Sequence, residues 1–303
     1  MVGTQNRTIS YLFAIFTVIV WGETFVSTKI LIEHGLSPVE IFIYRFAIAY
    51  VGLWFFTRQA LFCRSWRDEL LCIVLGLGGG SMYFLAENTA LQITQATDVS
   101  LLVSTSPILT AFVLRIFFRS SMRMSRQLIV GSFLALLGVA LVIFNGSIVL
   151  NLHITGYILS LLAALSWAFY GTALRKLSSA GYSSLFLTRK VFIYGILTAL
   201  PFALGTPNDA FHFSSLISSP AAVGHLLFLG IVASLLCYVM WNMAIHTLGV
   251  VRVTAFIYFI PVFTLLFSAP ILHERITWMA IVGMAFTIFG VYWTEKQPDR
   301  TRI

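Results

Sequence analysis

Two carboxylates lie inside long apolar stretches of the sequence, Glu23 in the first stretch and Glu87 in the third. An ionised carboxylate in the hydrocarbon of a bilayer is costly, so such a side chain takes up a proton or finds a cation. Glu23 therefore has two interpretations. In one it binds a coupling proton or the amine of a substrate. In the other it makes a structural contact, such as an ion pair with Lys29, Arg45 or Arg189.

Basic side chains in the same apolar stretches supply the complementary charge. Lys29 and Arg45 lie toward one end of the first two stretches, where long side chains can reach the membrane surface. Either they only extend to that surface, or one binds the carboxylate of a substrate, or one pairs with Glu87. Arg189, with Lys190 beside it, lies in the seventh stretch and either anchors it at a surface or faces a central cavity.

Two asparagines also lie within apolar stretches. Asn88 follows Glu87 and lies near Tyr83, and Asn242 occupies a similar position in the eighth stretch. An amide surrounded by lipid would lack hydrogen-bond partners, so both amides have to face protein or a watered cavity. They either line a substrate cavity or hold neighbouring helices together.

Several aromatic side chains lie deep in the apolar stretches. There, a ring with a polar edge can hold a small amphipathic substrate or an ammonium group. The group consists of Trp21, Trp167, Tyr170, Tyr238 and Trp241. Packing alone is the alternative explanation for each of them.

Two prolines, Pro107 and Pro261, fall near the middles of the fourth and ninth stretches. Each removes a backbone hydrogen bond and frees the carbonyl four residues earlier, at Val103 and Ile257. Breaks at equivalent places favour a hinge that bends, and a static kink is the alternative. Tyr258, just before the second proline, is a candidate for the wall of a cavity.

Membrane helices have to position these residues. The 303-residue chain is 59% hydrophobic and 10% charged, with a mean hydropathy of +0.92, which excludes a soluble domain. A helix needs roughly 20 apolar residues to cross a bilayer, and the continuous apolar runs indicate helices rather than barrel strands. We predict an all-α integral membrane protein with ten transmembrane helices, over residues 11–32, 39–57, 70–91, 98–118, 127–145, 154–174, 184–204, 221–245, 252–272 and 277–294.

The chain contains an internal repeat. At an offset of 154 residues Asn88 matches Asn242 and Pro107 matches Pro261, at an offset of 152 Gly138 matches Gly290, and at an offset of 146 Trp21 matches Trp167. Because each copy holds five helices, an odd number, the second copy enters the membrane from the opposite side. We predict two inverted five-helix repeats, residues 1–147 and 148–303, an architecture common in secondary transporters.

The net charge of +8 is a topology signal rather than a sign of nucleic-acid binding. With the N-terminus in the cytoplasm, the basic residues between helices concentrate on the cytoplasmic side, with Arg275 alone on the opposite side. They include Arg7, Arg64, Arg67, Arg126, Arg175, Lys176 and Arg252. Both termini are therefore expected in the cytoplasm.

The first two helices contain Trp21-Gly22, Lys29, Pro38 and Arg45 at a spacing that resembles the EamA family of the drug/metabolite transporter superfamily. The second repeat resembles the same family in a further set of residues: Asn242, Ala244, Pro261, the Glu274-Arg275 turn, Gly283 and Gly290. This resemblance covers the whole chain. It implies ten helices, an inner-membrane location, and export or exchange of amino acids or other small metabolites. Glu23 also looks like the membrane-embedded glutamate of the small multidrug transporters in that superfamily.

Signals for catalysis are weak. The six histidines lack metal-ligand spacing, no phosphate-binding loop is present, and the three cysteines do not form a disulfide framework, so we expect neither an enzyme nor a metal or cofactor site. We predict a secondary transporter in the lipid bilayer that exports or exchanges small molecules, most plausibly amino acids or related amines, by alternating access. Proton coupling is an option. Multidrug efflux, metabolite uptake and a non-transporting receptor or scaffold remain as alternatives, and the sequence does not indicate the oligomeric state.

Overall fold

A computed structural model describes residues 6–56, 61–94, 96–118, 125–144, 154–204, 219–272 and 277–295. The described elements are helical and group into ten membrane segments, as predicted. Eight segments are long and apolar enough to cross a membrane, and the fifth and tenth contain shorter apolar helices, Arg126–Leu141 and Ile281–Trp293. The prediction of an all-α integral membrane protein is confirmed. The expected Glu274-Arg275 turn and Arg275 itself lie outside the described residues.

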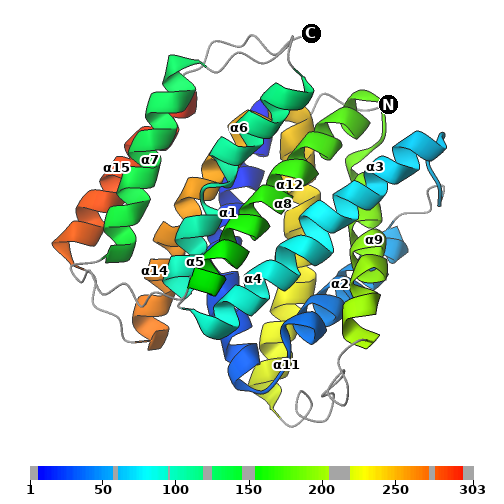
Figure 1. Cartoon of the computed structure of the whole chain (residues 1–303), viewed down its shortest axis with the longest axis horizontal. Coiled ribbons are helices and arrows are strands. Elements are labelled where there is room, and N and C mark those ends of the chain that lie inside the picture. The colour runs from blue at the N-terminus through cyan, green and yellow to red at the C-terminus, as the bar shows by residue number, and fades with distance from the viewer. Residues whose placement is uncertain are drawn as a thin grey trace.

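The first half contains five segments, two of which are made of more than one helical element (Figure 1). They are α1 (Arg7–Glu33), α2 (Pro38–Phe56), α3 (Trp66–Gly76) with η1 (Leu77–Ser81) and α4 (Met82–Ile93), α5 (Ala96–Val103) with α6 (Ser106–Phe117), and α7 (Arg126–Phe144). The second half follows the same order. Its elements are α8 (Ile154–Ser179), α9 (Ser184–Leu204), α11 (Pro220–Leu227) with η2 (Phe228–Leu236) and α12 (Cys237–Leu248), α13 (Val250–Thr254) with η3 (Ala255–Phe259) and α14 (Ile260–Leu272), and α15 (Trp278–Glu295).

Polar residues and glycines mark the helix ends. The side chains of Asn6, Ser65 and Ser219 each accept a hydrogen bond from a backbone N–H of the first turn of α1, α3 and α11. Gly35 and Gly181 end the first segment of each half with φ of +88° and +84°, a conformation that favours glycine. They match at the same offset of 146 residues as Trp21 and Trp167.

The two halves break their helices at matched positions. The third and eighth segments contain π-helical turns, η1 and η2, and residues 77–81 plus 154 give 231–235, which lie within η2. The fourth segment is interrupted at Ser104-Thr105, two residues before Pro107, and the ninth tightens into the 3₁₀ turn η3 before Pro261. The sequence repeat is therefore also a structural repeat, and two inverted five-helix repeats describe the fold.

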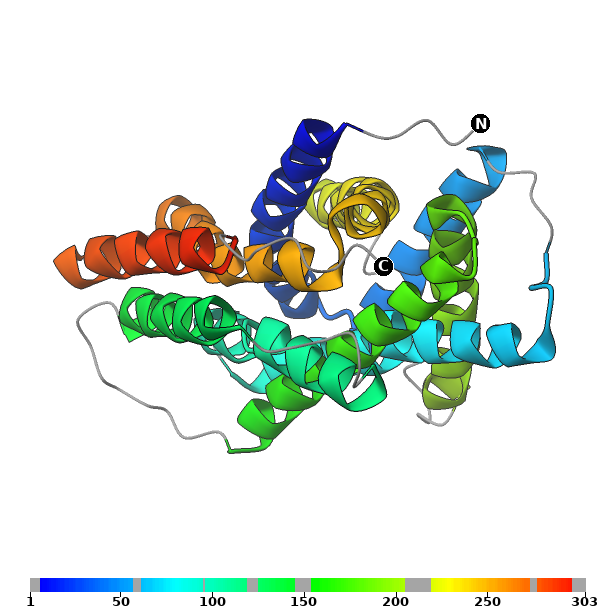
Figure 2. The same ribbon diagram turned by 90° about the horizontal axis from the view of Figure 1, so that it is seen from above.

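Helices α7 and α15 lie side by side at one edge of the molecule, each from a different half (Figure 2). Gly138 of α7 lies directly against the backbone of α15, and Gly290 of α15 lies directly against the backbone of α7. A Cβ atom at either glycine would fall 2.4 Å from a backbone nitrogen of the other helix. The repeat-related glycines thus allow the two helices to approach closely.

Candidate functional site

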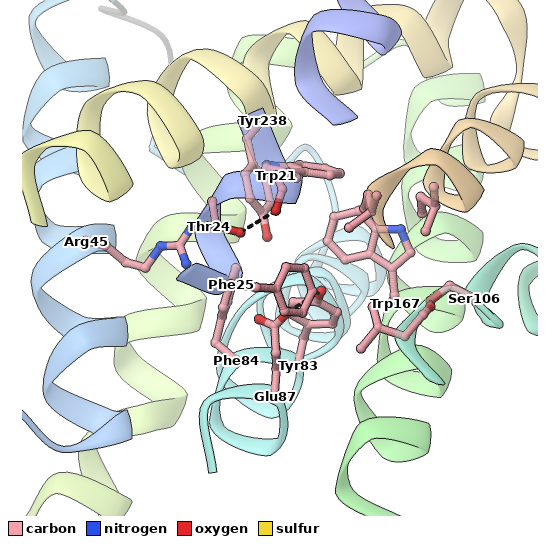
Figure 3. A pocket seen from close by; sticks show the side chains of 13 residues that line it. Trp21, Thr24, Phe25, Arg45, Tyr83, Phe84, Glu87, Ser106, Trp167 and Tyr238 are labelled. Atoms are coloured by element: carbon pink, nitrogen blue, oxygen red, sulfur yellow. Dashed lines mark hydrogen bonds between the residues drawn. The ribbon is translucent and has the colours of Figure 1, made fainter. Parts of the chain in front are cut away.

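A small cavity lies between the two halves, about 20 Å³ in volume, which is room for a single water molecule. Both halves contribute to its wall (Figure 3). The first half contributes Trp21, Thr24 and Phe25 from α1, Arg45 from α2, Tyr83, Phe84 and Glu87 from α4, and Val103 and Ser106 from either side of the break in the fourth segment. The second half contributes Trp167 from α8, Tyr238 from α12, Ile257 from η3 and Ile260 from α14.

A cation and an acid face this one cavity. Arg45 is only 1% exposed, so its side chain is directed inward instead of extending to the membrane surface. Its Nε donates a hydrogen bond of 2.9 Å to Ser234 Oγ, and its guanidinium carbon lies 4.3 Å from the centre of the Phe84 ring. The Glu87 carboxylate accepts a hydrogen bond of 3.0 Å from the Tyr83 hydroxyl.

The opposite charges of Arg45 and Glu87 attract each other electrostatically, but within the described residues these two side chains form no direct ion pair. Each retains hydrogen-bonding capacity beyond the contacts given above, because a guanidinium has five N–H donors and a carboxylate accepts several bonds. The cavity therefore offers a cationic partner for a negative group and an acidic partner for a positive group.

Aromatic rings form most of the remaining wall. The rings of Trp21 and Trp167, the pair related by the sequence repeat, meet edge to face at 5.2 Å between centroids. Tyr238 packs 5.8 Å from Trp21, and Tyr83 packs 5.2 Å from Trp167. The buried Trp167 Nε1 has no hydrogen-bond partner within the described structure. It is an unused hydrogen-bond donor on a residue that lines the cavity.

Two of the predicted aromatic residues form a second layer behind this wall. Trp241 lies 4.8 Å from Trp21, and Tyr170 lies 4.7 Å from Trp167. The Tyr170 hydroxyl donates a hydrogen bond to Asn242 Oδ1, and Asn242 Nδ2 donates to Thr188 Oγ1 at 2.8 Å. Asn242 thus joins α12 to α8 and α9 and does not line the cavity.

Other predicted residues also serve to join helices. Asn88 Nδ2 donates a hydrogen bond of 3.0 Å to the Pro38 carbonyl, which links α4 to α2. Lys29 donates to the carbonyls of Leu91 and Thr94 at the end of α4, at 3.2 and 2.9 Å. Neither Asn88 nor Lys29 lines the cavity in this structure, and the contacts of Asn88 and Asn242 join neighbouring helices.

Three further candidates lie elsewhere. Arg189 is buried near Phe186 on α9, and Tyr258 is fully buried in the small cluster that includes Ala135 of α7 and Val291 of α15. Glu23 lies on the side of α1 opposite Trp21, where it accepts a hydrogen bond from Ser27. None of the three lines the cavity, and Glu23 makes no ion pair with any residue in the described ranges.

The helix breaks at the two prolines both border the cavity. Val103 matches Ile257 and Ser106 matches Ile260 at the repeat offset of 154, and all four residues line it. Sequence reasoning named Val103 and Ile257 only as the freed carbonyls and did not place Ser106 or Ile260 in a cavity wall. It also missed Thr24, Phe25 and Phe84, which the repeat and the helical period could have grouped with Trp21 and Arg45.

Comparison with protein families identifies the chain. A model of the EamA-like transporter family matches residues 8–144 and again residues 154–295, one match for each half. The chain belongs to the EamA-like transporter family. It is a transporter and not an enzyme, and it is a multi-pass membrane protein.

Relatives of this EamA-like transporter match it over most of its length. A protein described as an uncharacterized transporter of Archaeoglobus fulgidus is 29% identical over 297 residues, covering 96% of this chain and 99% of its own. A probable amino-acid metabolite efflux pump of Salmonella typhimurium is 27% identical and covers 92% of each chain. A solved crystal structure has the same fold, with a TM-score of 0.71 at 17% identity over 95% of this chain and 96% of the other.

Proposed function

We propose that this EamA-like transporter exports or exchanges small organic metabolites, with amino acids or related amines as the substrate class, by alternating access. The observation that carries the proposal is that Arg45 and Glu87 both line one aromatic cavity between the two halves without forming a direct ion pair. The probable amino-acid metabolite efflux pump among the relatives supports the same substrate class.

An amino acid carries a carboxylate and an ammonium group a few atoms apart, which suits this pair of side chains. The guanidinium of Arg45 can form two parallel hydrogen bonds to a carboxylate. Glu87 can accept a hydrogen bond from an ammonium group, and the rings of Trp21, Trp167 and Tyr83 stabilise a nearby cation through their faces. In the free protein Ser234 and Tyr83 hold the two charged groups in place.

The size of the cavity requires a conformational change for transport. A volume of about 20 Å³ admits one water molecule but no amino acid, so the helices around it have to separate for a substrate to enter. Inverted repeats permit this by rocking about a site at the midplane. The matched breaks at Pro107 and Pro261 lie at the cavity, where bending would open it.

Orientation in the membrane follows from charge. Under the predicted topology, several helix ends lie on the same side of the membrane as the N-terminus of α1. These ends contain Arg64, Arg67, Arg126 and Arg175. Cytoplasmic ends of membrane helices carry such an excess of arginine and lysine. We propose that both termini are cytoplasmic and that the transporter resides in the cytoplasmic membrane.

Counterflow in liposomes tests the transport proposal. Proteoliposomes preloaded with a mixture of unlabelled amino acids should accumulate external labelled amino acids transiently, whereas vesicles preloaded with buffer should not. Arg45→Gln should abolish this accumulation, and the exposed Glu33→Gln should leave it unchanged. Failure of the wild-type protein to catalyse any amino-acid counterflow would refute the proposed substrate class.

A further inference from the structure

A second group of polar residues lies on α1, on the face opposite the cavity. Ser27 Oγ donates a hydrogen bond of 2.6 Å to Glu23 Oε1 and lies 2.8 Å from Nδ1 of His225 on α11. The other carboxylate oxygen, Glu23 Oε2, is buried and has no partner in the described structure. We refer to Glu23, Ser27 and His225 as the α1–α11 triad.

The hydrogen bonds of the triad are consistent with two protonation states of Glu23. When Glu23 is ionised, the single hydroxyl hydrogen of Ser27 points to the carboxylate, so His225 Nδ1–H has to donate to Ser27. When Glu23 is protonated, its own hydrogen can point to Ser27, Ser27 can donate to Nδ1, and the imidazole hydrogen moves to Nε2. Both arrangements satisfy the same contacts, and the direction of donation reverses between them.

A proton can therefore pass along the triad without leaving a charge on Ser27. His225 Nδ1–H gives its proton to Ser27 Oγ as Ser27 gives its own to Glu23 Oε1, and His225 Nε2 takes one proton from water. The net change is one proton from water to the Glu23 carboxylate, which becomes neutral. His34, at the end of α1, is the titratable group that acts on His225 electrostatically within the described residues. It lies two turns beyond Ser27 along α1.

The position related to the triad by the repeat, where α8 of the second half faces α3 of the first, has no such polar group. At the repeat offsets of 146 and 154 residues, Glu23 corresponds to Phe169, Ser27 to Ala173 and His225 to Leu71. Apolar side chains thus fill the related position in the same fold. The fold does not need a carboxylate, a hydroxyl and an imidazole there, so the polar group calls for a different explanation.

The triad is mechanically linked to the cavity through α1. Trp21, two residues before Glu23, lines the cavity and donates a hydrogen bond of 3.0 Å from Nε1 to the Ala233 carbonyl of η2. His225 lies on α11, which continues into η2. Two hydrogen bonds, Ser27 to His225 and Trp21 to Ala233, therefore fix α1 against one helix of the other half.

We propose that the α1–α11 triad is a proton-binding site, separate from the substrate cavity, through which a proton gradient drives the transporter. Protonation of Glu23 redirects the hydrogen bond between Ser27 and His225 and so changes how α1, with Trp21, is held against α11 and η2. Glu87 is then left to bind the substrate amine. The coupling role rests on the proposed transport function, whereas the binding of a proton by Glu23 does not.

Infrared difference spectroscopy of the full-length protein tests proton binding without any substrate. Between about pH 5 and about pH 8, in a Glu87→Gln background, the carbonyl band of a protonated carboxyl group should appear as the pH falls. Glu23→Gln should abolish that band, and Glu33→Gln at the exposed end of α1 should leave it unchanged. Retention of the band in Glu23→Gln would overturn the site.

The relay and the coupling have their own readouts. After a rapid drop in pH, Ser27→Ala and His225→Phe should slow the appearance of the Glu23 band, and an unchanged rate in both would overturn the relay.

In proteoliposomes, a pH gradient should increase uptake of labelled amino acids by the wild type but not by Glu23→Gln. Persistence of that increase in Glu23→Gln would overturn the coupling. A Glu23 band in a protein that shows no amino-acid counterflow would still support the proton site while refuting the proposed substrate class.

Discussion

The Glu69 carboxylate on α3 forms an ion pair with the Lys190 ammonium group on α9, so one charged contact joins the first half of the protein to the second. Tyr194 of α9 donates a hydrogen bond to the same carboxylate oxygen, and the Cys63 backbone N–H donates to the other oxygen at 2.6 Å. These contacts hold α3 against α9 near the ends where both helices begin. Any conformational change that opens this end has to break them.

Loss of this ion pair should expose Cys63. Burial raises the pKa of the Cys63 thiol, and the neighbouring Glu69 carboxylate raises it further, so little reactive thiolate is present at neutral pH. Glu69→Gln should increase the rate of maleimide labelling of Cys63, because it removes the negative charge and also loosens the contact with α9. The measurement requires a Cys72→Ala/Cys237→Ala background, in which Cys63 is the remaining thiol.

Lys190→Gln separates the two causes. The positive charge of Lys190 lowers the pKa of the Cys63 thiol, so its removal alone would slow labelling. If the ion pair holds the two halves together, Lys190→Gln should instead speed labelling through greater access. Slower labelling in Lys190→Gln would show that Glu69 acts on Cys63 through charge alone.

The contact between α7 and α15 predicts an effect on stability. Gly290→Ala would place a Cβ atom 2.4 Å from the backbone nitrogen of Ala135 and 2.7 Å from the Gly131 carbonyl oxygen, neither of which can move independently of its helix. Overpacking of this kind costs about 1 to 3 kcal/mol. We expect Gly290→Ala and Gly138→Ala to lower the melting temperature in detergent. Gly224→Ala is the matched control, because its Cβ would meet nothing within 4 Å.

Much of the fold followed from local features of the sequence. The length of the apolar runs predicted ten membrane segments, and the matched positions of Pro107 and Pro261 predicted breaks at equivalent depth. Trp21 and Trp167 were expected deep in their helices at repeat-related positions, and in the structure their rings meet. These properties depend on hydrophobicity and spacing, which a single sequence contains.

The assignment of polar residues to the cavity depended on information that spacing lacks. Asn88 and Asn242 needed partners in the membrane, but the sequence could not show that Pro38, Tyr170 and Thr188 supply them. Glu23 lies away from the cavity because successive residues of a helix are rotated by about 100°. A residue two positions after Trp21 therefore points to nearly the opposite face of α1. The π-helical turns in the third and eighth segments also shift the faces of α4 and α12 relative to a regular helix.

Glu87 should determine selectivity for the amine of the substrate. Its hydrogen bond to an ammonium group contributes about 1.5 to 3 kcal/mol, equivalent to a difference in affinity of about tenfold to about a hundredfold. In competition assays, Glu87→Gln should reduce the preference for an amino acid over the same carboxylic acid without its amine by that factor. Arg45→Lys, which keeps the charge but loses the planar fork, should weaken both compounds equally. An unchanged preference in Glu87→Gln would place the amine elsewhere.

Pro261 should speed transport by keeping the ninth segment flexible at the cavity. In a regular α-helix the Ile257 carbonyl would accept a hydrogen bond from the backbone N–H of residue 261, but proline has no N–H. The carbonyl accepts a hydrogen bond from the Ile260 N–H instead, which belongs to the 3₁₀ turn η3. Pro261→Ala restores the missing donor, so we expect a more regular helix that is about 0.5 to 1.5 kcal/mol more stable and a lower maximal rate of counterflow at a similar KM. Pro270→Ala, in the same helix but exposed and remote from the cavity, is the matched control and should leave the rate unchanged. If Pro261→Ala transported at the wild-type rate, the break would be a static kink. A segment that bends during each transport cycle would have to break the added backbone hydrogen bond each time, and this would slow the cycle.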